Sequence, residues 1–171
     1  MAKHLTLFGE NDASNIILRN ILEGSLPTYN IPPHKFNKCG SAKGVIVGGN
    51  FAVLSGLIGT EYNLFKTDTI LFIEDIGEPI YKVERMLYNL KLSGILSQLK
   101  ALIVGHFTNC EERDSNGETM YNMINRMLSH YSFPVAFDFP IGHIDTNSPI
   151  IVGATACLKI ENNKVLLSFC N

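Results

Sequence analysis

The 171-residue chain has few features that would tie it to a nucleic acid or a membrane. Its 14 Lys and Arg residues are outnumbered by 16 Asp and Glu residues, which gives a net charge of −2. The basic residues are scattered and form no stripe that could follow a phosphate backbone. Apolar runs such as residues 101–104 and 150–152 are far shorter than the ~18 residues of a membrane-spanning helix. The sequence therefore predicts no nucleic-acid partner and no membrane segment.

Motifs for disulfides, metals and cofactors are also missing. The four cysteines, Cys39, Cys110, Cys157 and Cys170, form no CxxC pair, and we expect reduced thiols. No His, Cys or acidic residues have the spacing of a recognised metal site, and no phosphate-binding glycine loop or GxSxG nucleophile motif occurs. The first residues lack the apolar core and cleavage site of a secretory signal. We therefore expect no metal, no cofactor and a cytoplasmic location.

What the chain does have is a regular alternation of apolar segments. Apolar residues make up 46% of the sequence and charged residues 18%, which is typical of one globular domain that buries roughly 70% of its unfolded surface. Strand-like and helix-like patterns alternate, an edge strand is expected within 25–43, and two strands flank Asn162-Asn163 as a hairpin. This order predicts a mixed α/β domain with parallel and antiparallel strands. The hairpin strands lie near 154–160 and 164–169, and the further predicted strands lie near 44–50, 69–73, 101–107 and 134–139. The predicted helices lie near 12–23, 51–59, 79–94 and 117–131.

A cluster of acidic residues lies where the strand at 69–73 gives way to a helix. Strand ends in α/β folds commonly carry functional side chains, because a rigid strand fixes the residue that follows it. Asp75 and Glu78 stand just before Pro79, where acidic groups complement the dipole of the coming helix. Glu74 directly continues the apolar strand, so helix capping explains it less well. Glu74 is therefore the candidate functional acid.

A distant loop supplies the candidate histidine. His143 follows Pro140 and Gly142, which shape a tight turn, and polar residues come directly after it. His106 also lies at a strand end, but it lacks polar neighbours in sequence, so we interpret it as a supporting or structural residue. A strand-end carboxylate and a loop histidine are two parts of a hydrolytic triad. The third part, an activated nucleophile, is not recognisable in the sequence.

Three segments of the chain together resemble one enzyme family. Their residue types and order are similar to those of the L,D-carboxypeptidases, serine peptidases that include muramoyltetrapeptide carboxypeptidase and the microcin C immunity protein. Phe51 departs from the family pattern, where leucine is usual. The three segments are Gly48-Gly49-Asn50-Phe51, residues 70–85 with Glu74, Tyr81 and Arg85, and Gly142-His143 with Asn147 and Gly153.

The resemblance implies a fold and a set of site residues. The expected fold for residues 1–171 is a three-layer β/β/α swivelling domain, the second half of a two-domain enzyme whose upstream half carries the serine. Glu74 would be the triad acid and His143 the general base, with their side chains about 2.6–3.2 Å apart. Gly49, Asn50 and Asn147 would contact the substrate.

The resemblance also implies a reaction. The family removes the terminal D-alanine from murein tetrapeptides during peptidoglycan recycling, by acyl transfer to the serine. The alternatives are hydrolysis of a peptidyl-nucleotide, as in microcin immunity, or a non-catalytic module that binds peptides or a partner. The expected partners are the murein peptide, the upstream nucleophile domain and a second copy in a homodimer. Because the serine is missing, we predict that this chain is inactive by itself.

Overall fold

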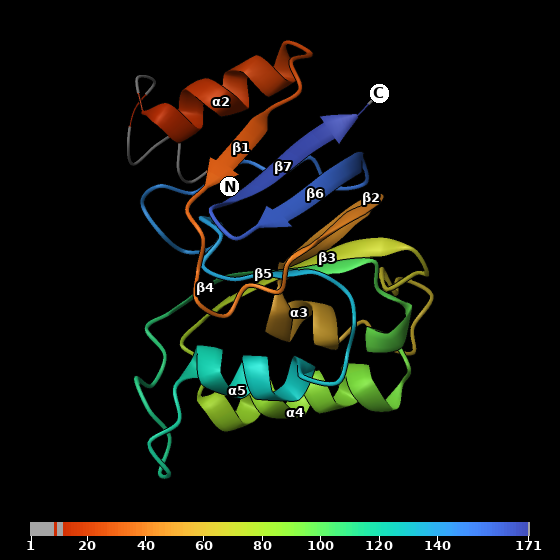
Figure 1. Ribbon diagram of the computed structural model, residues 1–171, viewed down its shortest axis with the longest axis vertical. Coiled ribbons are helices and arrows are strands. Elements are labelled where there is room, and N and C mark those ends of the chain that lie inside the picture. Colours follow the sequence, from red (N-terminus) through yellow and green to blue (C-terminus); the bar gives the residue numbers. More distant parts are fainter. Residues whose placement is uncertain (1–8, 10–11, 171) are drawn as a thin grey trace.

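The strands of the protein join into one mixed sheet in the computed structural model, which describes residue 9 and residues 12–170 (Figure 1). The strand order is β1-β7-β6-β2-β3-β4-β5, with β2, β3, β4 and β5 parallel to one another and β6, β7 and β1 antiparallel. The predicted mixture of strand directions is confirmed. The bounds are β1 Thr28–Ile31, β2 Gly40–Asn50, β3 Thr69–Ile76, β4 Ala101–Thr108, β5 Val135–Ala136, β6 Thr155–Glu161 and β7 Lys164–Cys170.

Helices cover one face of the parallel strands. Figure 1 shows α4 and α5 side by side below the sheet, with α3 between them and the strands, while β1, β7 and β6 stand above the parallel strands. These are the three layers that the resemblance implies. The bounds are α2 Ala13–Leu22, α3 Phe51–Ser55, α4 Ile80–Leu92, the 3-10 helix η1 Leu96–Gln98, and α5 Met120–Leu128.

Two apolar cores follow from the alternation of side chains along the strands. Leu71 and Ile73 of β3 face α4 and α5, whereas Ile70 and Phe72 face the opposite core. That opposite core includes residues of β6 and β7 and also Phe139 and Ile141, which lie shortly before His143. Neighbouring residues of one strand point to opposite faces. The chain around His143 therefore packs on the face of β3 that does not face α4 and α5.

The helix predicted at 79–94 has the expected ends. Pro79 is the N-cap residue of α4, and buried Ile80, Val83, Leu87 and Leu90 line its inner face. Gly94 has a φ of +74°, and Ile95 donates its N–H to the Leu90 carbonyl oxygen at 2.9 Å. This is the bonding of a Schellman helix end, where glycine is favoured because it has no Cβ.

Other elements differ in length from their prediction. The helix predicted at 51–59 ends at Ser55, because turns with Leu57 and Thr60 bonded three residues back replace it. The strand predicted at 134–139 is only Val135–Ala136, since the Phe137 N–H bonds the Asn37 side chain and Asp138 has a φ of +59°. The strand predicted at 69–73 is longer and ends at Ile76.

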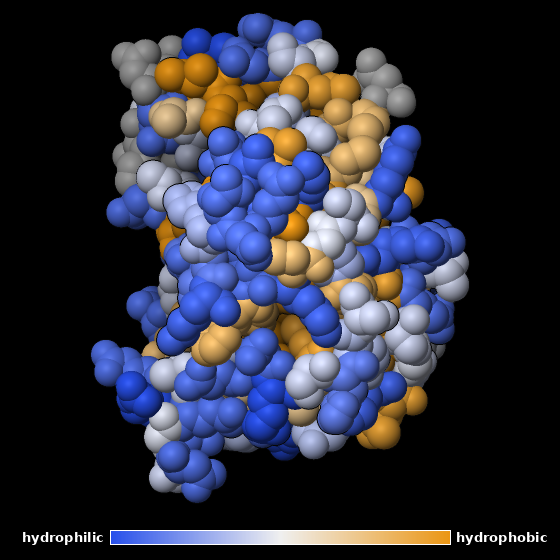
Figure 2. All heavy atoms as spheres, in the orientation of Figure 1, coloured by the Kyte–Doolittle hydropathy of each residue, from blue (hydrophilic) through white to orange (hydrophobic). Residues whose placement is uncertain are grey.

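Some exposed apolar side chains lie at the end of the molecule that carries α2. Figure 2 shows hydrophobic residues gathered over this end, where Ile16, Leu22 and Leu26 are exposed. Asp12 caps α2, accepting from the backbone N–H of Ser14 and Asn15. Of the helices formed by the described residues, none has the length and apolar character needed to cross a membrane.

Candidate functional site

Glu74 stands within β3, near the carboxyl edge of the parallel strands. The sequence placed it after the strand; in the structure it pairs in register with Asn50, the last residue of β2. On its other side the register shifts, so that Gly105 and His106 of β4 stand opposite this single residue. Bulges of this kind often re-aim side chains beside active sites. The irregularity accompanies the turn of the Glu74 side chain toward the chain that carries His143.

Short-range contacts fix the loop that presents His143. The Gly142 N–H donates to Asn147 Oδ1 at 3.0 Å, and the Ser148 N–H donates to the Pro140 carbonyl oxygen at 2.7 Å. The His106 N–H bonds the Ile141 carbonyl oxygen at 2.9 Å, which fastens the loop to β4. The loop therefore approaches the sheet through backbone contacts.

Glycine at position 142 is required by close approach. Gly142 has a φ of +132°, and a Cβ built there would lie 3.2 Å from Glu74 Oε2 and 3.1 Å from the His106 carbonyl oxygen. A side chain would both strain the backbone and press on the carboxylate. The motif glycine thus allows the imidazole and the carboxylate to meet.

Glu74 and His143 form a direct pair. His143 Nδ1 lies 2.8 Å from Glu74 Oε2, within the separation expected from the sequence. The Glu74 side chain is 11% exposed and the His143 side chain 30%. Burial raises the pKa of Glu74, the hydrogen bond and charge of His143 oppose this, and the nearby Asp75 charge adds to the rise. An Nδ1–H that donates to Glu74 leaves Nε2 as the proton acceptor of a neutral ring.

Asp75 does not have the role that the sequence suggested. We interpreted it as a start residue of the helix at 79–94, but its carboxylate turns to α3. It accepts from the Asn50 side chain at 2.6 Å and from the Ala52 N–H at 2.9 Å. Alternation along β3 explains the difference, because residue 75 must point to the face opposite Glu74. Glu78 remains at the helix start and pairs with Lys82 at 3.3 Å.

The three predicted substrate contacts lie around the pair but differ in availability. Asn50 uses both ends of its amide inside the protein, since Oδ1 accepts from the Val53 N–H at 3.1 Å and Nδ2 donates to Asp75. The Asn147 side-chain oxygen accepts a hydrogen bond from the Gly142 N–H. A Cβ at Gly49 would meet no atom within 4 Å, so the backbone there is open to approach. The substrate role of all three stays a prediction.

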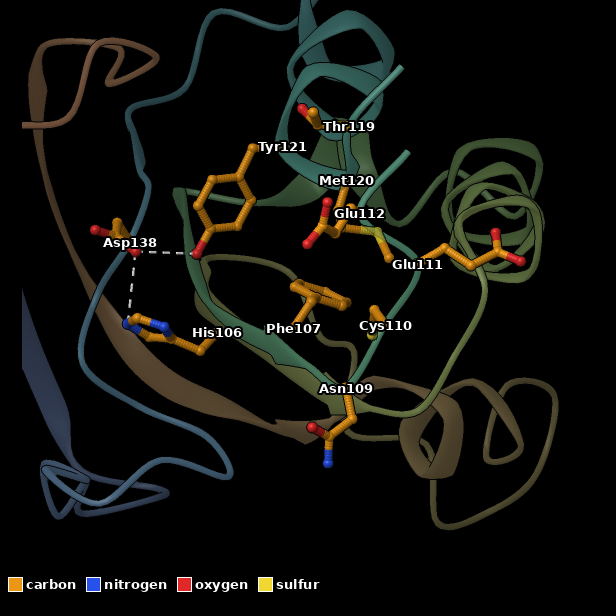
Figure 3. A pocket seen from close by; sticks show the side chains of 10 residues that line it. All are labelled: His106, Phe107, Asn109, Cys110, Glu111, Glu112, Thr119, Met120, Tyr121 and Asp138. Carbon is orange, nitrogen blue, oxygen red and sulfur yellow. Dashed lines mark hydrogen bonds and ion pairs between the residues drawn. The ribbon is translucent and has the colours of Figure 1, made fainter. Parts of the chain in front are cut away.

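A second histidine–carboxylate pair lines a neighbouring cleft. His106 Nε2 lies 3.5 Å from Asp138 Oδ1, and the Tyr121 hydroxyl lies 3.2 Å from the same oxygen. Figure 3 shows these side chains turned toward one another at one end of the cleft, which has a volume of about 390 Å³. Burial and the Asp138 carboxylate raise the pKa of Tyr121. Sequence reasoning missed this group because Asp138 and Tyr121 adjoin His106 only in the fold.

Metal ligands do not converge here. Among the residues that the structure describes, no group of three or more His, Cys, Asp or Glu side chains could hold a metal ion. The candidate site is therefore an α/β sheet edge with a buried carboxylate, a partly exposed imidazole and a tightly approaching glycine loop.

Comparison with known proteins assigns this arrangement to a family. Residues 43–158 match the family model of the LD-carboxypeptidase C-terminal domain, and the chain belongs to this family. It is 31% identical over 129 residues to a probable murein peptide carboxypeptidase of Bacillus subtilis, covering 75% of this chain and 40% of that protein. It is 30% identical over 143 residues to the murein tetrapeptide carboxypeptidase of Pseudomonas aeruginosa, covering 81% and 44%.

A solved structure agrees with the fold. The muramoyltetrapeptide carboxypeptidase of Oxalobacter formigenes superposes with a TM-score of 0.86 at 31% identity, covering 95% of this chain and 56% of that one. The chain thus spans about half the length of the proteins it matches.

Proposed function

We propose that this chain is the Glu–His half of a serine L,D-carboxypeptidase that acts on murein peptides. The observation that carries the proposal is the 2.8 Å contact between His143 Nδ1 and Glu74 Oε2 at a sheet edge, in a chain whose relatives are named as murein peptide carboxypeptidases. The bond that this enzyme breaks is the amide to the terminal D-alanine of a murein tetrapeptide.

In this proposal His143 transfers one proton while Glu74 orients the imidazole. His143 Nε2 accepts the proton of the serine hydroxyl as the hydroxyl oxygen attacks the peptide carbonyl, and the imidazolium then gives that proton to the leaving amine. Glu74 accepts the Nδ1–H bond, which fixes the tautomer and stabilises the imidazolium. The low exposure of Glu74 supports this role, because water screens a buried ion pair less.

The second half of the site comes from an upstream domain of the same protein. That domain supplies the serine and the oxyanion hole, and its serine oxygen stands about 2.6–3.2 Å from His143 Nε2 in the working enzyme. The support is the length of the relatives, of which this chain spans about half. Residues 1–171 form a single domain in this proposal. We also propose that the full-length protein is cytoplasmic. Its proposed oligomeric state is a homodimer, and light scattering of the full-length protein measures that state.

Hydrolysis of a murein tetrapeptide by the full-length protein tests the function. We expect release of D-alanine, no release by the 171-residue chain alone, and a loss of at least about 10³-fold in kcat for Glu74→Gln. A peptidyl-nucleotide assayed in parallel distinguishes the alternative substrate. Full activity of Glu74→Gln, or no hydrolysis of the tetrapeptide by the wild type, would sink the proposal.

A further inference from the structure

We propose that Asp75 is a positioning residue for Glu74: it fastens the end of β3 to the start of α3 and so holds the Glu74 carboxylate against His143. The use of this device in catalysis rests on the proposed function, but the coupling of Asp75 to the Glu74–His143 pair does not.

Asp75 is a buried carboxylate held by N–H donors. It is 1% exposed. Its Oδ1 accepts from Asn50 Nδ2 at 2.6 Å and from the Ile76 N–H at 2.9 Å, and its Oδ2 accepts from the Ala52 N–H at 2.9 Å. The ion pairs of the described lysines and arginines go to other carboxylates. A buried carboxylate is retained only where its bonds are satisfied, and here N–H groups satisfy it.

These bonds hold β3 at the point where its pairing with β4 is interrupted. Glu74 has a register partner on β2, Asn50, but none on β4, because the register shifts between Ile73 and Asp75. The Asn50 side chain binds Asp75, the residue directly after Glu74. The hydrogen bond between Asn50 and Asp75 thus joins the last residue of β2 to the residue that follows Glu74 in β3. It lies on the face of the sheet opposite His143.

The chemistry of the clamp requires a carboxylate at position 75. All three partners are N–H groups, so an asparagine there would place its own NH₂ against a donor. Asn50 cannot simply be removed either, since its Oδ1 caps α3 through the Val53 N–H. The clamp is therefore specific to this pair of side chains.

Nuclear magnetic resonance of the 171-residue chain tests the coupling without any need for activity. The readout is the exchange rate with water of the His143 Nδ1–H proton that is bonded to Glu74. We expect Asp75→Asn to speed this exchange at least about tenfold, and Asn50→Ser, which keeps an N-cap oxygen but loses the Asn50 donor, to act in the same direction.

Glu78→Gln is the matched control. It also neutralises a carboxylate of this acidic segment, but Glu78 pairs with Lys82 and not with Asn50. It should leave the rate within twofold. The proposal is overturned if folded Asp75→Asn leaves the rate within twofold of wild type. If circular dichroism shows that Asp75→Asn does not fold, Asn50→Ser decides by the same criterion.

The full-length protein separates this inference from the proposed function. There Asp75→Asn should lower kcat more than it raises KM, since the clamp acts on the catalytic pair. A wild type without peptidase activity would overturn the function but not the measured coupling of Asp75 to His143.

Discussion

Among the residues that the structure describes, two histidine–carboxylate pairs differ in their separation and in the burial of the carboxylate, although their histidine side chains are about equally exposed. Glu74 and His143 lie 2.8 Å apart, with the Glu74 side chain 11% exposed. His106 and Asp138 lie 3.5 Å apart, with the Asp138 side chain 51% exposed. The first carboxylate comes from a strand in the middle of the sheet. The second lies in the connection between β5 and the His143 loop, at a residue with positive φ.

The difference shows what makes such a pair useful for chemistry. In the buried pair, a rigid strand and a braced loop fix the carboxylate and the imidazole, and little water screens them. In the exposed pair, water screens the charges and the contact contributes about 0–1 kcal/mol at most. Residue types alone do not distinguish the two pairs, whereas burial and anchoring do.

The largest expected difference is catalytic. In the full-length protein, His143→Ala should lower kcat/KM by at least about 10³-fold, because it removes the proposed general base. His106→Ala should change kcat/KM less than about threefold. Steady-state hydrolysis of the murein tetrapeptide measures both. Equal losses for the two variants would remove the distinction between the pairs.

The backbone beneath the two pairs offers the next test. A Cβ at Gly105 would lie 2.6 Å from both the carbonyl oxygen and Cγ1 of Ile141. Gly105→Ala should therefore lower the free energy of unfolding by about 1–3 kcal/mol through overpacking. Gly56→Ala is the control, because its Cβ would meet nothing closer than 3.4 Å. Urea denaturation of the 171-residue chain measures both, and equal stabilities would contradict the close approach of the loop.

The buried pair should also give the stability a pH dependence. Because burial raises the pKa of Glu74 above 4.5, the folded state holds this proton more tightly than the unfolded state. The stability that this provides is full below pH 4.5 and is lost as the pH rises through the raised pKa. Glu74→Gln should flatten this fall, because it removes the titrating group. Denaturation of the wild type and of Glu74→Gln across this pH range measures the difference.

The smallest effect concerns the exposed pair itself. Asp138 has a φ of +59°, which glycine adopts without strain and alanine does not. Asp138→Ala should therefore be about 1 kcal/mol less stable than Asp138→Gly. Thermal denaturation compares the two directly. If alanine proved the more stable, the backbone at Asp138 would not be strained as described.

Local pattern predicted much of the fold. Apolar periodicity and end signals located α4, including Pro79 at its start and Gly94 at its end, and the hairpin around Asn162-Asn163 formed as expected. Lengths were less well predicted. The strand that contains Glu74 extends to Ile76 because β2 and β4 pair with it beyond the apolar run, and pairing partners are not visible in a local window.

The candidate site divides in the same way. Glu74 and His143 were identified from their sequence blocks, and their contact agrees with that expectation. The bonds of Asp75 to Asn50 and Ala52 were not foreseen, because the sequence offered a nearer explanation in the helix that follows. Asp138 and Tyr121 were missed for a related reason, since they meet His106 only where separate elements converge.

The sequence by itself determined the family, the mixture of strands and helices, and the two residues proposed for catalysis. These depend on residue types and order, which are properties of the chain. Only the tertiary structure decided which carboxylate turns to which face, which histidine meets a buried carboxylate, and at which positions only glycine fits. Those outcomes depend on strand register and side-chain alternation. Both are fixed only when β2, β3 and β4 pair and the His143 loop packs against them.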